Sequence, residues 1–279
     1  MTLFKKFRRW VDEPGNSLVL SGSIMFVTVV LMGILVPLFY RFGPYDFVGD
    51  PLQPPSLTYL FGTDQLGRDI FSRTFHAVYR DLGVAFIGVS IPFLMGTLIG
   101  IILGTSTNKW VTNLIGSLID GINAFPLLII AVASIAFLGP GLSSVIIILT
   151  LVNWARYAKI ARTKAVVVSK ANYIEAAYTL GYPKRRIFRK HIGPNVSSET
   201  IAFALGDFVL VVLLVAGLSF LGLASTPPTA EWGAMINEGR TYLISSKWVS
   251  TFPGVALCWS AISVSLVVDG LNRREGKIQ

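Results

Sequence analysis

Charged residues and cysteines are scarce in this sequence. Lys, Arg, Asp and Glu make up 14% of the 279 residues, whereas a soluble domain carries roughly a quarter. The single cysteine, Cys258, excludes a disulfide within the chain, so cysteine usage indicates no redox compartment. Because 53% of the residues are hydrophobic, the composition is typical of an integral membrane protein.

Motifs of catalytic and nucleotide-binding sites are also missing. The sequence has no phosphate loop of the form G-x-x-x-x-G-K-[ST], no H-E-x-x-H, no C-x-x-C and no serine elbow. The predicted topology puts His76 and His191 on opposite sides of the membrane, which excludes a shared metal site. We therefore expect a non-catalytic chain that holds no metal and no cofactor of its own.

Apolar residues gather in six blocks. Each is about as long as the 20 residues that a helix needs to cross a bilayer, and too long and uniform for a β-barrel strand. The first follows a basic head but exceeds the apolar core of a signal peptide, so we expect it to be retained. The sequence thus predicts an all-α polytopic membrane protein with six transmembrane helices. The head holds Lys5, Lys6, Arg8 and Arg9, and the blocks cover residues 18–40, 82–104, 114–138, 142–160, 200–224 and 251–268.

Positive charge is unevenly divided between the two sides that six spans create. Of the 24 Lys and Arg residues, 18 fall on the side of both termini. This excess predicts cytoplasmic N- and C-termini. The net charge of +9 is then mostly a topology signal, so we expect the lipid bilayer and no nucleic acid as a partner. The other six residues are Arg41, Arg68, Arg73, Arg80, Arg240 and Lys247.

The loop between the first two blocks carries a helical pattern in its second half. Asp69 and Arg73 have the i, i+4 spacing of a helical ion pair. The pattern predicts an amphipathic helix on the outer surface before the second block. Its shared face consists of Leu66, Ile70, Phe71, Thr74, Phe75 and Val78.

Three glycines recur every four residues in the second block, at Gly96, Gly100 and Gly104. Small residues at this spacing let two helix backbones approach closely. Membrane helices are also richer in glycine generally, but three in register favour a packing seam. Such a seam suits a sliding contact between helices.

Three acidic residues lie inside the blocks. Asp120 and Asp269 fall near predicted cytoplasmic ends, where we expect them to cap helices or pair with basic residues. Asp207 lies nearly three turns into the fifth block, and two roles remain open for it. It lines a transport pathway, or it forms a hydrogen bond to a neighbouring helix or subunit. Further pathway candidates, each of which also suits helix packing, are Asn123, Asn153, Trp154, Ser219 and Trp259.

A basic, polar insert separates the fourth and fifth blocks: "NYIEAAYTLGYPKRRIFRKHIGPN", residues 172–195. Asn172 and Glu175 have capping-box spacing, Gly181 can end a helix in the left-handed conformation, and Pro183 prevents its continuation. A second, basic helix then leads to Gly193 and Pro194. Spacing alone leaves open whether this insert docks on a cytoplasmic motor or is a well-capped connector.

The insert resembles the EAA loop of binding-protein-dependent ABC transporter permeases, E-A-A-x-x-x-G-x(9)-I-x-L-P. His191 stands at the Ile position and Gly193 at the Leu position. Many relatives also carry an acid where this chain has Val215, and Asp207 could substitute for it from two turns upstream. The matching residues are Glu175, Ala176, Ala177, Gly181 and Pro194.

Other stretches resemble the second permease subunit of dipeptide, oligopeptide and nickel ABC importers, in order from about residue 60 to 272. The resemblance implies a permease core over 81–272, with a cytoplasmic EAA loop at 169–195. Residues 1–80 would form the head, first span and outer loop, and 273–279 a cytoplasmic tail. The stretches are "FGTDQLGRDIFSR", "AFPLLI", "LGPGL", "LSFLGLA", "PPTAEWG" and "DGL".

The resemblance also implies a type I ABC importer in a bacterial or archaeal cytoplasmic membrane. A second permease chain would complete the pathway, two ATP-binding subunits would hold ATP and Mg, and an extracytoplasmic binding protein would deliver the substrate. Peptides are the expected substrate, with nickel, glutathione-like compounds and oligosaccharides left open. The implied ATPase-coupling residues are Glu175, Ala176, Ala177, Leu180, Gly181, Tyr182 and Pro183.

Two other functions remain open from the residues alone. A secondary carrier would use Asp207 as its ion site and would transport without an ATPase. A membrane scaffold would use the basic insert for docking and would form no pathway.

Overall fold

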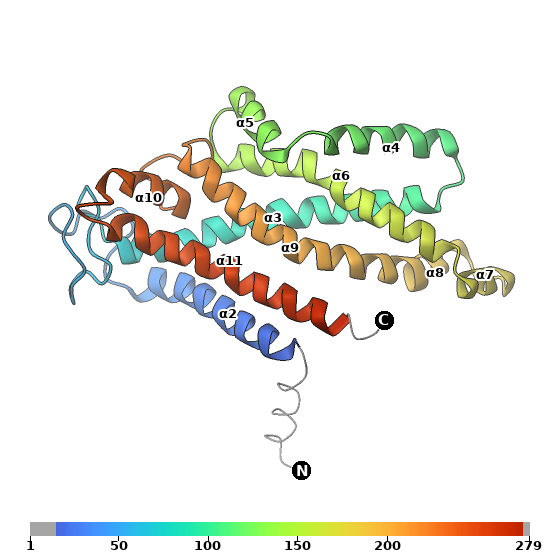
Figure 1. Cartoon of the computed structure of the whole chain (residues 1–279), viewed down its shortest axis with the longest axis horizontal. Coiled ribbons are helices and arrows are strands. Elements are labelled where there is room, and N and C mark those ends of the chain that lie inside the picture. The colour runs from blue at the N-terminus through green and yellow to red at the C-terminus, as the bar shows by residue number, and fades with distance from the viewer. Residues whose placement is uncertain (1–14, 276–279) are drawn as a thin grey trace, which may run out of the picture. The chain divides into compact units, whose positions relative to one another are not determined.

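The computed structural model describes residues 15–275, which form helices joined by turns and isolated bridges (Figure 1). Five helices are long and apolar enough to cross a membrane, and the bent pair α4–α5 makes a sixth if it counts as one. The predicted all-α class is confirmed. The basic head at residues 5–9 and residues 276–279 of the tail lie outside the described residues. The helices are α2 (Asn16–Phe39), α3 (Ile70–Thr105), α4 (Lys109–Asn123), α5 (Leu127–Leu138), α6 (Leu142–Ser169), α7 (Asn172–Thr179), α8 (Lys184–Ile187), α9 (Gly193–Phe220), α10 (Trp232–Gly239) and α11 (Trp248–Glu275).

The third apolar block is not the single helix that the sequence analysis predicted. α4 and α5 meet at an angle of 88° across residues 124–126. Pro126 causes the break, because its ring disfavours the helical conformation at Phe125 and it has no N–H for a helical hydrogen bond. The carbonyl of Pro126 instead accepts hydrogen bonds from Ile129 and Ile130 and so begins α5.

The chain divides into two compact units, and two long helices contribute to both. Unit 1 comprises the described residues of 1–85, 139–142 and 208–279, and unit 2 comprises 86–138 and 143–207. α3 and α9 each begin in one unit and end in the other.

In unit 1, α2 lies beside α11, and α10 packs near the start of α11 (Figure 1). The α2–α11 contact is close at Gly22, where a Cβ would lie 2.5 Å from the carbonyl oxygen of Ser263. A small core of Ile70, Met235 and Val249 joins the start of α3 to α10 and α11.

The predicted amphipathic surface helix is instead the first part of α3, a helix of 36 residues. Asp69 stands just before it and accepts a hydrogen bond from the Ser72 N–H at 2.7 Å. Asp69 is therefore a cap, and the predicted Asp69–Arg73 ion pair is wrong. The predicted apolar face is buried in protein at Ile70, Thr74 and Val78, because α2, α10 and α11 pack against this end of α3.

Four charged side chains form a buried ion cluster in unit 1. Arg68 contacts Asp64 at 2.6 Å and Glu238 at 2.9 Å, and Arg73 contacts Glu238 at 3.1 Å and Asp64 at 3.6 Å. All four side chains are less than a tenth exposed. Two positive and two negative charges balance each other. The cluster therefore joins α10 to the first turn of α3 and to the segment that precedes α3.

In unit 2, α3 packs against α6 along its three regularly spaced glycines. A Cβ at Gly96 or Gly100 would overlap with the carbonyl oxygen of Trp154 or Ala158, respectively. A Cβ at Gly104 would lie 2.7 Å from the carbonyl oxygen of Arg162. The facing positions on α6 are also small, at Ala158, Ala161 and Ala165. The two backbones therefore lie in direct contact over two turns of α3.

We predict that Gly100→Ala lowers the stability of the protein, because the added methyl group meets the backbone of α6. The expected loss is about 1–3 kcal/mol, as for overpacked cores. Gly83→Ala on the same helix is the matched control, because a Cβ there meets nothing within 4 Å. Thermal unfolding in detergent measures both variants. Equal melting temperatures would contradict the close contact at Gly100.

We also predict that Glu238→Gln destabilises the protein by about 3–5 kcal/mol, because it leaves two buried guanidinium groups with a single carboxylate. The control is Glu199→Gln, which removes a half-exposed ion pair with Lys164 and should cost about 0–1 kcal/mol. Thermal unfolding compares the two variants. If Glu238→Gln is as mild as Glu199→Gln, the ion cluster does not hold unit 1 together.

Candidate functional site

The insert between α6 and α9 begins with a short helix that is capped differently from the sequence prediction. Ala171 precedes α7, and its carbonyl accepts hydrogen bonds from the N–H groups of Ile174 and Glu175. Asn172 is already the first helical residue, and no side chain caps the helix. The predicted capping box is therefore wrong, because Asn172 stands one position too late to act as the cap.

The end of α7 follows the sequence prediction. Gly181 has a φ of +77°, its N–H donates to the carbonyl of Tyr178, and the N–H of Tyr182 donates to the carbonyl of Ala177. These two bonds form the Schellman motif, which favours glycine at the left-handed position. Pro183 then precedes α8 in an extended conformation, so the chain turns sharply between the two helices.

The second, basic helix that the sequence predicted to lead to Gly193 and Pro194 is continuous with α9. A π-helical turn at Phe188–Ile192 joins α8 to α9, and residues 184–220 together make one helix of 37 residues. Pro194 lacks the N–H of a regular helical bond. The π turn, in which the Gly193 N–H donates to the carbonyl of Phe188, inserts an extra residue just before this proline and lets the helix continue.

One face of the insert is buried in a hydrophobic cluster with three long helices. Ile174 and Ala177 of α7 contribute to it, together with Ile187 of α8. We call this cluster the α7 seat. It ties the insert to α3, α6 and α9 within unit 2. The other members of the α7 seat are Ile101, Ala161, Ala165, Val168, Ile192 and Val196.

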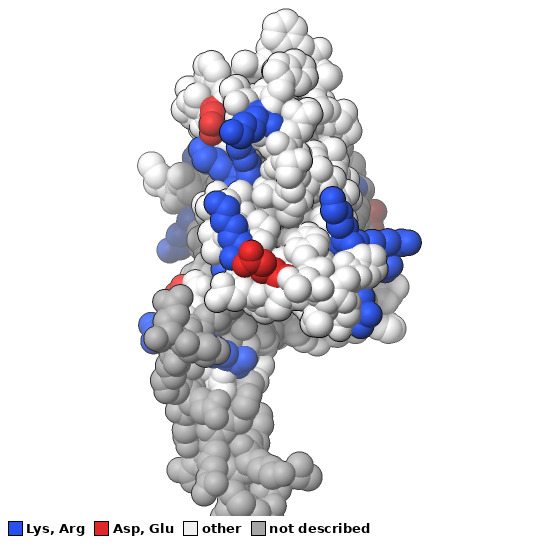
Figure 2. Space-filling view, turned by 90° about the vertical axis from the view of Figure 1, so that its right-hand side faces the viewer, with Lys and Arg blue, Asp and Glu red and all other residues white. Residues whose placement is uncertain are grey.

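The rest of the insert is exposed, and large apolar side chains flank its buried face. Leu180 is 72% exposed, and Tyr173 and Tyr178 are about half exposed. Figure 2 views the molecule from the side on which α7 and α8 lie in Figure 1, and Lys and Arg predominate over Asp and Glu there. Exposed apolar groups rimmed by charges are typical of a protein interaction site.

The seven residues that the resemblance assigned to coupling divide between these two faces. Ala177 is buried at 6% exposure and belongs to the α7 seat. Tyr182 is half-buried, with the Arg186 guanidinium 4.3 Å above its ring. The exposed residues are Glu175, Ala176, Leu180, Gly181 and Pro183.

Two of the pathway candidates come together in unit 2. The hydroxyl group of Tyr157 donates to Asp207 Oδ2 at 2.8 Å, and Asn153 Nδ2 lies 3.5 Å from the same oxygen. Asp207 is only 2% exposed. The bonds link α9 to α6, as in the second role that the sequence left open for Asp207. Sequence reasoning missed Tyr157, although it follows Asn153 by one helical turn and so shares its face.

The other candidates are scattered over the two units. Asn123 ends α4, and the indole of Trp154 donates to the carbonyl of Leu151 on its own helix. Ser219 is buried in α9, within unit 1. Trp259, on α11, donates to the carbonyl of Met25.

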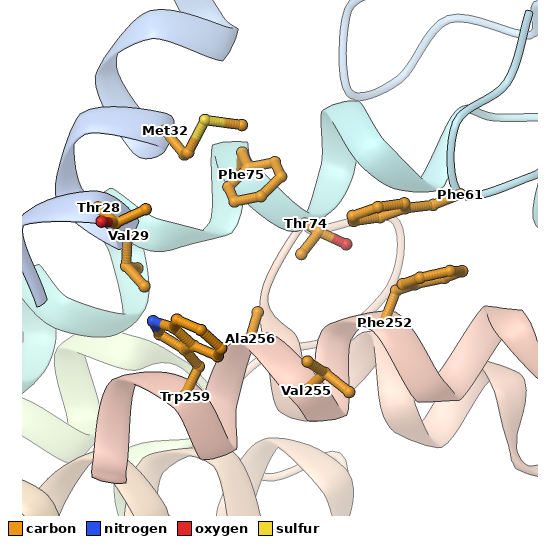
Figure 3. A pocket seen from close by; sticks show the side chains of 10 residues that line it. All are labelled: Thr28, Val29, Met32, Phe61, Thr74, Phe75, Phe252, Val255, Ala256 and Trp259. Carbon is orange, nitrogen blue, oxygen red and sulfur yellow. The ribbon is translucent and has the colours of Figure 1, made fainter. Parts of the chain in front are cut away.

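Trp259 also lines an apolar pocket in unit 1, between α2, α3 and α11 (Figure 3). Its volume is about 150 Å³. Phe61 and Phe252 stack at 3.9 Å along one side, and Thr74 supplies one hydroxyl group. The lining carries no charged residue.

Asp120 and Asp269, which were predicted to cap helices or to pair with basic residues, lie on α4 and α11. Asp120 forms an exposed ion pair with Lys159 of α6 at 2.8 Å, and Asp269 is exposed on α11. Between residues 15 and 275, no group of three or more His, Cys, Asp or Glu side chains could hold a metal ion.

Comparison with known proteins identifies the chain's relatives. Residues 96–276 match the family described as "Binding-protein-dependent transport system inner membrane component". A putative peptide transport system permease of Brucella suis is 35% identical, covering 90% of this chain and 84% of the relative. A dipeptide transport system permease of Alkalihalophilus pseudofirmus is 33% identical, covering 92% and 84%. A glutathione transport system permease of Escherichia coli is 36% identical, covering 87% and 82%.

Two solved structures share the fold at lower identity. The MetNI methionine ABC transporter matches with a TM-score of 0.56 and 17% identity, over 74% of this chain and 96% of that chain. An amino acid ABC transporter with histidines matches with a TM-score of 0.54 and 18% identity, over 72% and 94%. The chain is a multi-pass, non-catalytic permease subunit, and it belongs to the family of inner membrane components of binding-protein-dependent ABC transport systems.

Proposed function

We propose that this permease imports peptides as one of two similar chains in a type I ABC importer. The peptide and dipeptide permeases among its relatives support the substrate class. The glutathione permease supports small peptide-like solutes in particular, and nickel and oligosaccharides stay open. An extracytoplasmic binding protein would deliver the substrate, and two ATP-binding subunits would supply the energy and hold ATP and Mg.

In this proposal the chain crosses the membrane six times, with α4 and α5 as one broken span and both termini in the cytoplasm. The excess of Lys and Arg on the side of the termini supports this orientation. The segment 169–195 is then cytoplasmic, and α7 can meet the ATPases.

The single observation that carries the proposal is the two-faced character of α7. Ile174 and Ala177 are buried in the α7 seat, while Leu180 and the two tyrosines of α7 are exposed. A connector needs no exposed apolar face, whereas a docking helix needs both a fixed back and an apolar front. Glu175, Ala176, Leu180, Gly181 and Pro183 would form the contact with an ATPase, and Tyr182 would border it.

Movement of α7 would be passed on through rigid packing. The α7 seat joins α7 to α3, α6 and α9, the glycine contact joins α3 to α6, and the Tyr157–Asp207 bond joins α6 to α9. Because close-packed elements shift as units rather than bending, closure of the ATPases would move these helices together. The glycine contact then serves as a rigid joint rather than the sliding contact that the spacing first suggested.

Asp207 has a structural role in this account. Its carboxylate receives hydrogen bonds from Tyr157 and Asn153 inside the protein, which supports a link between two helices. Family membership argues against the ion-coupled carrier and the scaffold, because the relatives are permeases of ATP-driven systems. Trp259 and Asn123 remain candidates for the pathway.

The docking role predicts that substitutions on the exposed face of α7 release the ATPases without unfolding the permease. Glu175→Lys and Leu180→Asp should each reduce the ATPase subunits that co-purify with the permease by about tenfold, which corresponds to roughly 1.4 kcal/mol. Stimulation of ATP hydrolysis by the peptide-loaded binding protein should fall in parallel. Co-purification and ATPase assays of the reconstituted transporter measure both effects.

Two control variants separate docking from folding. Glu199→Lys reverses a half-exposed glutamate of α9 outside the insert and should retain the ATPases. Ala177→Leu overfills the α7 seat and should lower the melting temperature of the permease itself, whereas Ala176→Leu at the neighbouring exposed position should not. If a well-folded Leu180→Asp variant keeps its ATPases and their stimulation, α7 is not the docking helix.

A further inference from the structure

A groove between α4 and α6 has no part in the coupling proposal. It lies within unit 2 and has a volume of about 410 Å³. Gly116 and Asp120 contribute from α4, and Lys159 and Arg162 from α6. The two helices run side by side in Figure 1.

The groove lining has two positive side chains and one negative side chain, so one positive charge is left over. Lys159 and Asp120 form an ion pair at 2.8 Å, but Arg162 makes no hydrogen bond or salt bridge with any described residue. Arg162 is nonetheless half-buried. Its guanidinium lies against the backbone of α4, where a Cβ at Gly116 would overlap with Nη1. Asp120 is already paired with Lys159, and a partly buried guanidinium group without a hydrogen-bond acceptor is unfavourable, so the groove is suited to an anion.

The side chains that line the groove indicate which class of anion it would bind. The planar guanidinium group suits the paired oxygens of phosphate or carboxylate. Val166 and Val167 line the same groove. A ligand with a negative head and an apolar body satisfies both parts of the lining. In a membrane protein, such a ligand is present at the surface as anionic phospholipid.

A second feature of α4 favours a lipid over a free anion. The helix begins with Lys109 and Trp110, and Trp110 is 73% exposed. Tryptophan and lysine at the end of a helix are typical of the boundary between headgroups and acyl chains. The lining residues of α4 lie six to ten residues from Trp110, and those of α6 lie two to ten residues from Ser169, where α6 ends. The groove is therefore within reach of a headgroup.

We propose that the groove binds an anionic phospholipid, with Arg162 donating hydrogen bonds to the phosphate group. Lys159, held by Asp120, adds positive charge at the rim, and Val166 and Val167 contact an acyl chain. With the orientation proposed above, this lipid belongs to the cytoplasmic leaflet, where basic pockets between helices bind anionic headgroups. The site lies apart from the exposed face of α7. Lipid binding would therefore be a second function of unit 2, separate from ATPase docking.

Native mass spectrometry of the full-length permease, purified with its accompanying subunits, tests the proposal. Phosphatidylglycerol, phosphatidylcholine and inorganic phosphate are added separately as probes. The wild-type protein should retain phosphatidylglycerol in preference to phosphatidylcholine, and Arg162→Gln should weaken this retention by about tenfold. Arg162→Lys keeps the charge but not the planar guanidinium group, so it should weaken the retention less than Arg162→Gln does. Lys164→Gln removes a cation from the same helix outside the groove and should change nothing.

Several results would overturn the proposal. Equal retention of the two lipids by the wild type would show that the protein does not select an anionic headgroup. Equal losses of lipid in Arg162→Gln and Lys164→Gln would show that the groove is not the binding site. Inorganic phosphate that displaces phosphatidylglycerol one for one would indicate a site for free anions. Loss of an accompanying subunit in Arg162→Gln, with lipid binding unchanged, would make the groove a subunit contact. Lipid retention does not depend on ATPase docking, so this test can fail while the coupling proposal stands.

Discussion

The burial of one face of α7 is the constraint on which the rest of unit 2 depends. Ile174 and Ala177 can be buried only if α3, α6 and α9 meet beneath them. Burying each large aliphatic side chain contributes about 1.5–3 kcal/mol, so a short helix that would be marginal alone is held in one orientation. The same contact leaves Leu180 exposed. Local packing thus determines which side of the insert is available to an ATPase.

Polar interactions then fix how the helices meet. The Tyr157–Asp207 bond joins α6 to α9 inside unit 2, and the ion cluster around Arg68 and Glu238 joins the start of α3 to α10 in unit 1. Each is buried, so removing one partner leaves a costly unpaired group. The hydrophobic effect is not directional, whereas each of these bonds joins particular residues of two helices.

Local features of the fold were the most predictable from sequence. Apolar block lengths located the long helices, and Gly181 marked the end of α7, because both follow from the backbone and nearby residues. Features that depend on tertiary contacts were not. Glu238 lies 170 residues from Arg68, so no local pattern indicates their pairing. The sequence indicated a second, basic helix leading to Gly193 and Pro194, but no local pattern indicated the π turn that joins this helix to α9. Asp69 had the spacing of an ion pair and instead caps α3.

The distance between α7 and the middle of α6 during the ATPase cycle tests the central claim most directly. Spin labels at Asn172→Cys and Leu151→Cys, in a Cys258→Ser background, report this distance by pulsed electron paramagnetic resonance. We expect the same distance distribution in the nucleotide-free and nucleotide-trapped transporter, because α7 and α6 move as one body. A shift of several ångströms between the two states would contradict it and would mean that α7 moves on its seat.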